Sequence, residues 1–183
     1  MKRIAFTLAA LVVAVSAQAQ GVVNFSTRAG PSVNAPVWYF GYGSPDWALA
    51  DGRIVGQLYA AAPSETLAPV GVPTPFRSDA GKGYITAGGN VVIPGVLPGG
   101  VAEIKLVAWA STLGTTYLDA VWKGQGGVGE SPVITITVGG GTLPAALLTG
   151  LQGFRIFPVP EPSPVALGLL GGGVVVLLRK RGS

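Results

Sequence analysis

Carboxylates are the first side chains in this sequence that could carry chemistry. Two carboxyl groups about 5–10 Å apart can hydrolyse a glycosidic bond. The acids between residues 20 and 158 occur in turn sequences such as Asp51-Gly52 and Asp79-Ala80-Gly81, close to a basic residue, or on predicted strand surfaces. We therefore expect no catalytic pair and no enzyme activity among Asp46, Asp51, Glu65, Asp79, Glu103, Asp119 and Glu130.

Aromatic rings are the second group, and they are densest in Trp38-Tyr39-Phe40-Gly41-Tyr42 and Trp47. In a strand, Trp38, Phe40 and Tyr42 would share one face and Tyr39 would lie on the other. The favoured interpretation places these rings in the core, as we also expect for Trp109 and Trp122. In the alternative, an exposed row stacks on sugar rings, and its contact residues would be Trp38, Tyr39, Tyr42 and Trp47.

The composition excludes several kinds of site. The sequence has no cysteine and no histidine, so it can form no disulfide, no thiolate or imidazole metal site and no Ser-His-Asp triad. A calcium-binding Asp-x-Asp-x-Asp-Gly loop is also missing. We predict neither a metal nor a cofactor.

The net charge of +4 comes from the ends of the chain. Between residues 20 and 158, seven basic and seven acidic side chains balance. Nucleic-acid binding requires basic residues clustered on the folded surface. We therefore expect no nucleic-acid partner. The five terminal cations are Lys2, Arg3, Arg179, Lys180 and Arg181, and the only acid outside residues 20–158 is Glu161.

The elements that must position these side chains are predicted to be strands. Only 11% of the residues are charged, and the chain contains 29 glycines and 15 prolines. Short β-prone runs separated by such residues favour a single all-β domain, 20–158, of β-sandwich or jelly-roll type. The expected strands are Val22–Ser26, Val37–Tyr42, Arg53–Ala60, Tyr84–Ala87, Val91–Ile93, Ala102–Ala110, Tyr117–Trp122, Val133–Val138 and Phe154–Phe157.

Alternation is clearest in the run Ala102–Ala110. Charged Glu103 and Lys105 alternate with Ile104 and Leu106, which predicts that the two aliphatic side chains face the core. One short helix is predicted near Pro144–Leu148. From Gly139 onward we expect a semi-flexible run, although residues 151–157 are apolar enough to dock as a last strand.

The first 19 residues have the features of an export signal. Lys2 and Arg3 precede an apolar run from Ile4 to Val15, and Ala17-Gln18-Ala19 supplies small residues for cleavage. This order is typical of a secretory signal peptide. We expect export and a mature chain that begins at Gln20.

The C-terminal segment, 159–183, combines three features. Pro160-Glu161-Pro162 precedes an apolar run, which ends at Arg179-Lys180-Arg181. At about 1.5 Å per residue, 162–178 span roughly 25 Å, slightly less than a bilayer core of about 30 Å. Because cations close the run, we predict a transmembrane helix over about 163–178 with a basic cytoplasmic stop at 179–181.

These three features together resemble the PEP-CTERM sorting signal of exported Gram-negative proteins. The resemblance implies transient anchoring in the inner membrane and processing near Pro160-Glu161-Pro162 by an exosortase-type transpeptidase. The preceding domain, including Gln57-Leu58-Tyr59-Ala60, is also similar to uncharacterised proteins with this tail in Verrucomicrobia-like bacteria. Leu143-Pro144-Ala145-Ala146 does not match the motif of Gram-positive sortases.

The function predicted from the sequence is structural or adhesive. The protein is expected in the cell envelope or extracellular matrix after sorting, with exopolysaccharide as a further partner if the aromatic row is exposed. A carbohydrate-binding module is thus the second hypothesis, and a glycan-acting enzyme is the third.

Overall fold

The computed structural model describes residues 20–40, 47–123 and 126–157, which form an all-β structure with one short α-helix. The predicted signal peptide, sorting motif and transmembrane helix lie outside these residues. No helix within the described ranges is long and apolar enough to cross a membrane. The strands are β1 (Gly21–Asn24), β2 (Arg28–Ala29), β3 (Val33–Asn34), β4 (Val37–Phe40), β5 (Trp47–Leu49), β6 (Ile54–Ala61), β7 (Ala68–Pro75), β8 (Asn90–Ile93), β9 (Val101–Ala110), β10 (Val128–Glu130), β11 (Ile134–Thr137), β12 (Ala146–Leu147) and β13 (Phe154–Ile156).

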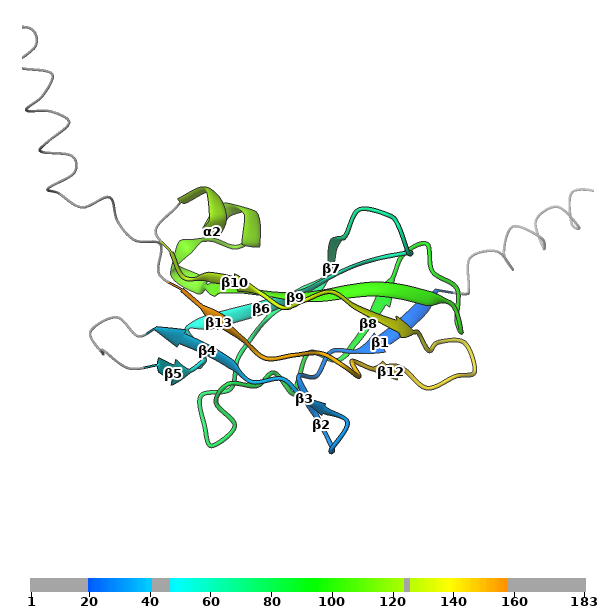
Figure 1. Cartoon of the computed structure of the whole chain (residues 1–183), viewed down its shortest axis with the longest axis horizontal. Helices are drawn as coiled ribbons and strands as arrows, with labels where there is room; N and C mark the ends of the chain where they lie inside the picture. Colours follow the sequence, from blue (N-terminus) through cyan, green and yellow to red (C-terminus); the bar gives the residue numbers. More distant parts are fainter. Residues whose placement is uncertain (1–19, 41–46, 124–125, 158–183) are drawn as a thin grey trace, which may run out of the picture.

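The largest sheet has the order β10-β9-β6-β7, with β11 also paired to β9. The remaining strands form three smaller sheets, β12-β1-β8, β13-β4-β5 and β2-β3. In Figure 1 the long strands β6 and β9 run along one side of the molecule, and β4, β13 and β12 run along the other. The described chain begins at one end of the molecule, beside β1, and finishes at the opposite end, after β13.

The main core lies beneath β9 and β6. Ile104 and Leu106 are fully buried in it, so the predicted alternation is confirmed. From Leu106 to Trp109 every residue of β9 is buried. This continuous burial arises because β9 is covered on both faces there, and Val107 and Trp109 point into a second, smaller cluster.

The second cluster lies under α2 (Tyr117–Lys123), where Trp109 packs with Leu113 and Ala120. The Trp109 indole donates a hydrogen bond of 3.0 Å from Nε1 to the Gly114 carbonyl oxygen, which follows the 3₁₀ turn η1 (Ser111–Leu113). Trp109 is fully buried. Its predicted place in a core is therefore confirmed.

The strand predicted at Tyr117–Trp122 is wrong, because this segment forms α2. The cause is local. The Asp119 amide donates to Thr116 Oγ1 at 3.1 Å, and Asp119 Oδ2 accepts from the Thr116 amide at 3.3 Å. This reciprocal pair is a capping box, which provides partners for amides that the first turn of a helix leaves free.

Two further predictions of local structure are wrong. Tyr84–Ala87 forms no strand, since the Ile85 amide donates to the buried Thr27 hydroxyl at 2.9 Å instead of to a ladder carbonyl. Pro144–Leu148 contains no helix, because Ala146 and Leu147 pair in parallel with β1. The run after Gly139 is likewise packed, and β13 pairs with β4, which confirms the alternative of a last docked strand.

The eight-residue strand β7 has no counterpart among the predicted strands. It carries Pro69, Pro73 and Pro75, and proline disfavours strand assignment because it lacks a ladder amide. The structure accommodates these prolines because β7 is the terminal strand of the largest sheet. On such an edge strand, a residue whose backbone points away from the neighbouring strand needs no amide hydrogen for the ladder.

Ser131 joins β10 to β11 along the same edge of β9, and its hydroxyl replaces a missing ladder bond. The buried Leu106 amide donates to Ser131 Oγ at 3.0 Å, and the Ser131 amide donates to the Leu106 carbonyl at 2.8 Å. Ser131→Ala would leave the Leu106 amide without an acceptor, so we expect a loss of about 1–3 kcal/mol in unfolding free energy. Urea denaturation measures this loss. Ser131→Thr keeps the hydroxyl and serves as the control, and an equal loss in both variants would contradict the assignment.

Candidate functional site

The small sheet β13-β4-β5 brings aromatic side chains from three separated parts of the sequence onto one face. In the antiparallel pair β4–β5, Trp38 lies opposite Leu49, and Phe40 lies opposite Trp47. In the parallel pair β13–β4, Arg155 lies beside Trp38. The resulting set is called the aromatic face and comprises Trp38, Phe40, Trp47, Arg155 and Phe157.

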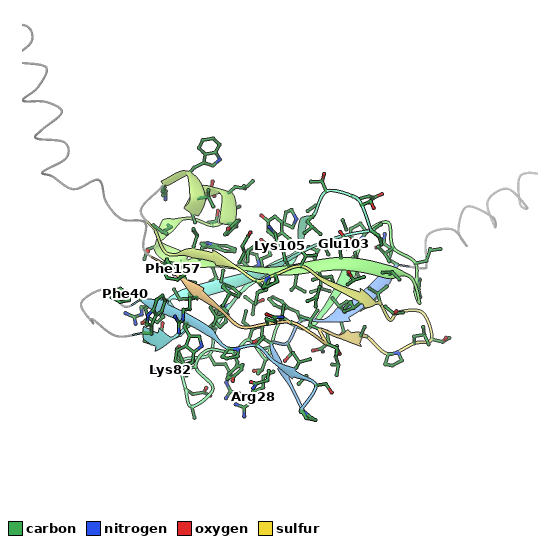
Figure 2. The ribbon with its side chains drawn as sticks, in the orientation of Figure 1. Arg28, Phe40, Lys82, Glu103, Lys105 and Phe157 are labelled. Atoms are coloured by element: carbon green, nitrogen blue, oxygen red, sulfur yellow. The ribbon has the colours of Figure 1, made fainter. Side chains whose placement is uncertain are left out.

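Three rings of the aromatic face pack edge to face. The Trp47 centroid lies 5.6 Å from Phe40 and 5.1 Å from Phe157, with interplanar angles of 77° and 83°. The Arg155 guanidinium carbon is 4.9 Å from the Trp47 ring centroid, in a cation–π contact. These contacts fix the Trp47 ring between two neighbours and beneath a cation. Figure 2 shows Phe40 and Phe157 close together at one end of the molecule.

The aromatic face is largely open to solvent. Trp38 is 38% exposed, Phe40 40% and Phe157 58%, while Trp47 is partly buried. The favoured prediction that the Trp38–Trp47 stretch forms the core is therefore wrong for Trp38 and Phe40. The sheet fills its inner side with Val37 and Ile156, both fully buried, and alternation turns Trp38 and Phe40 outward.

Tyr39 lies on the inner side of the sheet, opposite the face that carries Trp38 and Trp47. The Arg53 guanidinium donates to Tyr39 Oη and forms a 3.0 Å ion pair with Asp51 Oδ2. The hydrogen bond from Arg53 lowers the pKa of Asp51, and the Asp51 carboxylate raises the pKa of Arg53. Burial, followed by the nearby Asp51 charge, raises the pKa of Tyr39. Tyr42 lies outside the described residues.

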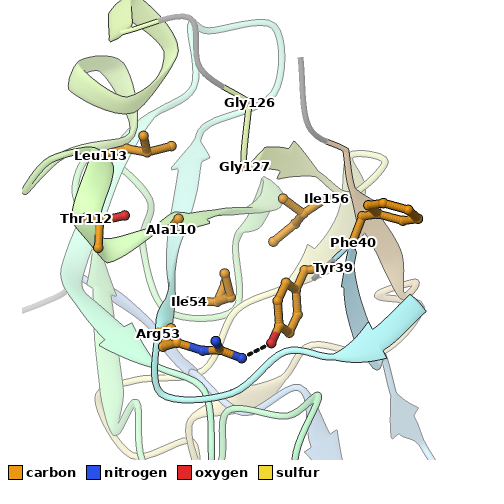
Figure 3. A pocket seen from close by; sticks show the side chains of 10 residues that line it. All are labelled: Tyr39, Phe40, Arg53, Ile54, Ala110, Thr112, Leu113, Gly126, Gly127 and Ile156. Atoms are coloured by element: carbon orange, nitrogen blue, oxygen red, sulfur yellow. Dashed lines mark hydrogen bonds between the residues drawn. The ribbon is translucent and has the colours of Figure 1, made fainter. Parts of the chain in front are cut away.

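A pocket of about 320 Å³ opens beside Tyr39. Figure 3 shows the Tyr39 ring and its bond to Arg53 on one wall, with Phe40 at the rim. The other walls are mostly apolar and contain no carboxylate. They are formed by Ile54, Ala110, Thr112, Leu113, Gly126, Gly127 and Ile156.

Three further carboxylates, those of Asp79, Glu130 and Asp119, have structural contacts. Asp79 Oδ1 accepts a hydrogen bond of 2.8 Å from Arg77 Nε. This bond is the largest of the causes that lower the pKa of Asp79 to about 2. Glu130 pairs with Lys105 at 2.7 Å. Asp119 caps α2. Within residues 20–40, 47–123 and 126–157, no three acidic side chains form a group that could hold a metal ion.

Two members of the aromatic face, Arg155 and Phe157, were not among the predicted site residues. Their alternation with Phe154 and Ile156 is visible in the sequence, but their position beside Trp38 depends on parallel pairing between distant strands. Trp122, which was expected in the core, is 86% exposed on α2. Its predicted burial is wrong because Ala120 is the α2 residue that turns inward.

Comparison of the chain with protein families, with curated proteins and with solved structures gives no match.

Proposed function

We propose that this protein is a non-catalytic, exported adhesive module that binds polysaccharide of the cell envelope or extracellular matrix through its aromatic face. The exposed row of Trp38, Phe40 and Phe157 carries the proposal. Flat apolar rings stack on the C–H faces of sugars, and rings held by their neighbours lose little freedom on binding. The contacts of Trp47 with Phe40 and Phe157 provide such support.

The export and sorting steps of this proposal come from the ends of the sequence. A signal peptide at 1–19 delivers the chain to the inner membrane, and the tail from 159 to 183 anchors it until an exosortase-type enzyme processes it near Pro160-Glu161-Pro162. We infer that residues 20–158 form a β-sandwich or jelly-roll domain. Two layers of long and short strands, with the main core between them, support this architecture.

The charge of the aromatic face favours an acidic polysaccharide. Arg155 is exposed above Trp47 and forms no ion pair with a described carboxylate. A sugar carboxylate can therefore approach the Arg155 guanidinium while its ring stacks on a neighbouring aromatic. We infer a uronate-containing chain as the preferred ligand class.

Polysaccharide pull-down tests the proposal. We expect the protein to be retained by alginate or another polyuronate, and Trp38→Ala or Trp47→Ala to weaken binding on the order of tenfold. Arg155→Gln should weaken binding to the polyuronate but not to a neutral β-glucan.

Trp122→Ala is the matched control, since it removes an exposed indole on α2, outside the aromatic face. Circular dichroism verifies that each variant is folded. Absence of retention on every polysaccharide, or an equal loss in the Trp122 control, would rule out this binding site and leave a purely structural role.

A further inference from the structure

Helix α2 presents an apolar face to solvent. Leu118, Val121 and Trp122 occupy positions i, i+3 and i+4 and therefore share one side of the helix. They are 58%, 44% and 86% exposed. Ala120, on the opposite side, is buried against the Trp109 cluster. A surface helix normally turns charged residues outward, so an outward side made of three apolar residues indicates a partner.

This face lies at the end of the domain where the chain leaves it. Strand β10 begins shortly after α2, and the Gly127 amide donates to the carbonyl of Phe157, the last described residue, at 3.0 Å. Val128 forms an antiparallel bridge with Phe157. Figure 1 shows α2 and β13 at the same end, with β1 and the turn before β12 at the other.

The chain that follows Phe157 limits how far this end can be from a membrane. Residues 158–164 separate Phe157 from the apolar run and, even fully extended, span at most about 24 Å. If the tail inserts as proposed above, Phe157 is confined to that distance from the start of the apolar run, and α2 lies at the same end of the domain (Figure 1). Such a tether gives a weak surface contact a high effective concentration.

We propose that α2 rests in the interfacial layer of the bilayer while the tail anchors the protein, with Trp122, Leu118 and Val121 as its lipid contacts. This inference depends on the anchored tail of the proposed function. Tryptophan favours the headgroup region, where its ring is apolar and its N–H stays hydrated. Lys123, in the last turn of α2, adds a cation suited to anionic lipid headgroups.

The area of the α2 face favours lipid over a second copy of the chain. Three side chains on a seven-residue helix fall well short of the about 800 Å² per partner that a stable protein interface buries. A tethered lipid contact needs no such area, because the tail supplies the anchoring.

Tryptophan quenching by lipid tests this contact. The chain without residues 1–19 is reconstituted into phosphatidylcholine–phosphatidylglycerol vesicles, and co-flotation reports insertion of the tail. The four tryptophans of the chain are Trp38, Trp47, Trp109 and Trp122, so the tail contributes no emission. With phosphatidylcholine brominated near the headgroup end of the acyl chain, we expect emission to fall by about a quarter, and Trp122→Phe to abolish the decrease.

Two controls make the result specific to α2. Trp38→Phe should retain the quenching. The second control adds Leu143→Trp to the Trp122→Phe variant. Leu143 forms a bridge with Gly140 at the opposite end of the domain, so an indole there should not restore the quenching. Co-flotation without quenching, or quenching lost in Trp38→Phe instead, would overturn the α2 contact while leaving the tail anchor intact. Failure to co-float would overturn the anchor and this inference with it.

Discussion

Replacing Trp109 by alanine is expected to lower the unfolding free energy by about 3–5 kcal/mol, the range found for removal of a large buried aromatic side chain. Trp109 is fully buried between β9 and α2 and is the largest side chain of the second cluster. Its loss removes contacts with Leu113 and Ala120 and the hydrogen bond to Gly114. Because α2 packs on this residue, the helix should lose its support. Urea denaturation and the far-ultraviolet helical signal measure both effects.

Trp122→Ala is the control for this prediction, because the same residue type lies nearby on α2 but is 86% exposed. We expect a change within about 0.5 kcal/mol for this surface substitution. Similar losses in the two variants would mean that the burial assigned to Trp109 is wrong.

The sequence was sufficient for the core face of β9 but not for Trp109, which lies on the same face as Glu103 and Lys105 and is buried there with Ala120 of α2. In β9, the alternation of Glu103 and Lys105 with Ile104 and Leu106 identified the core face. A charged side chain at every second position allows only the face with the aliphatic side chains to pack against the core. No such pattern surrounds Trp122. Trp122 is flanked by the apolar Val121 and the basic Lys123, which do not indicate the face on which its ring lies. Because the segment was predicted to be a strand, the ring was expected in the core.

The helical signal for α2 was nevertheless present in the sequence. Thr116 and Asp119 stand at the spacing of a capping box, and the structure confirms both of their hydrogen bonds. The β-prone Tyr117 and Val121 favour a strand and concealed this signal. The segment nevertheless forms a helix, because a specific cap outweighs residue propensity in so short a segment. The Thr116–Asp119 cap therefore predicts a helix that residue propensity alone does not.

The aromatic face could not be derived from local sequence in the same way. Alternation correctly grouped Trp38 with Phe40 and separated Tyr39, but it does not say which group faces solvent. That choice depends on β13, whose Ile156 fills the inner side next to Tyr39. Pairing between residues so far apart in the chain is a property of the whole fold, and therefore neither the exposure of Trp38 nor the position of Arg155 followed from the sequence.

Gly139→Ala is expected to lower the unfolding free energy by more than about 3 kcal/mol, because the new methyl group would meet immovable backbone. Gly139 forms reciprocal hydrogen bonds of 3.0 Å with Val22 of β1. A Cβ at this position would lie 1.7 Å from the Pro144 carbonyl oxygen and 2.7 Å from its carbonyl carbon. The run that was expected to be semi-flexible is thus a tight crossing of two backbone segments. Thermal or urea denaturation measures the effect.

Gly150→Ala separates this steric effect from the general effect of replacing glycine. Gly150 has a φ of +87° and no atom within 4 Å of a built Cβ, so only backbone strain of about 1–2 kcal/mol is expected. A flexible linker at residue 139 would accept alanine more easily than this control does. If Gly139→Ala proves the milder of the two substitutions, the close packing of Gly139 against Pro144 is refuted, and with it the path that leads the chain from β11 through β12 to the aromatic face.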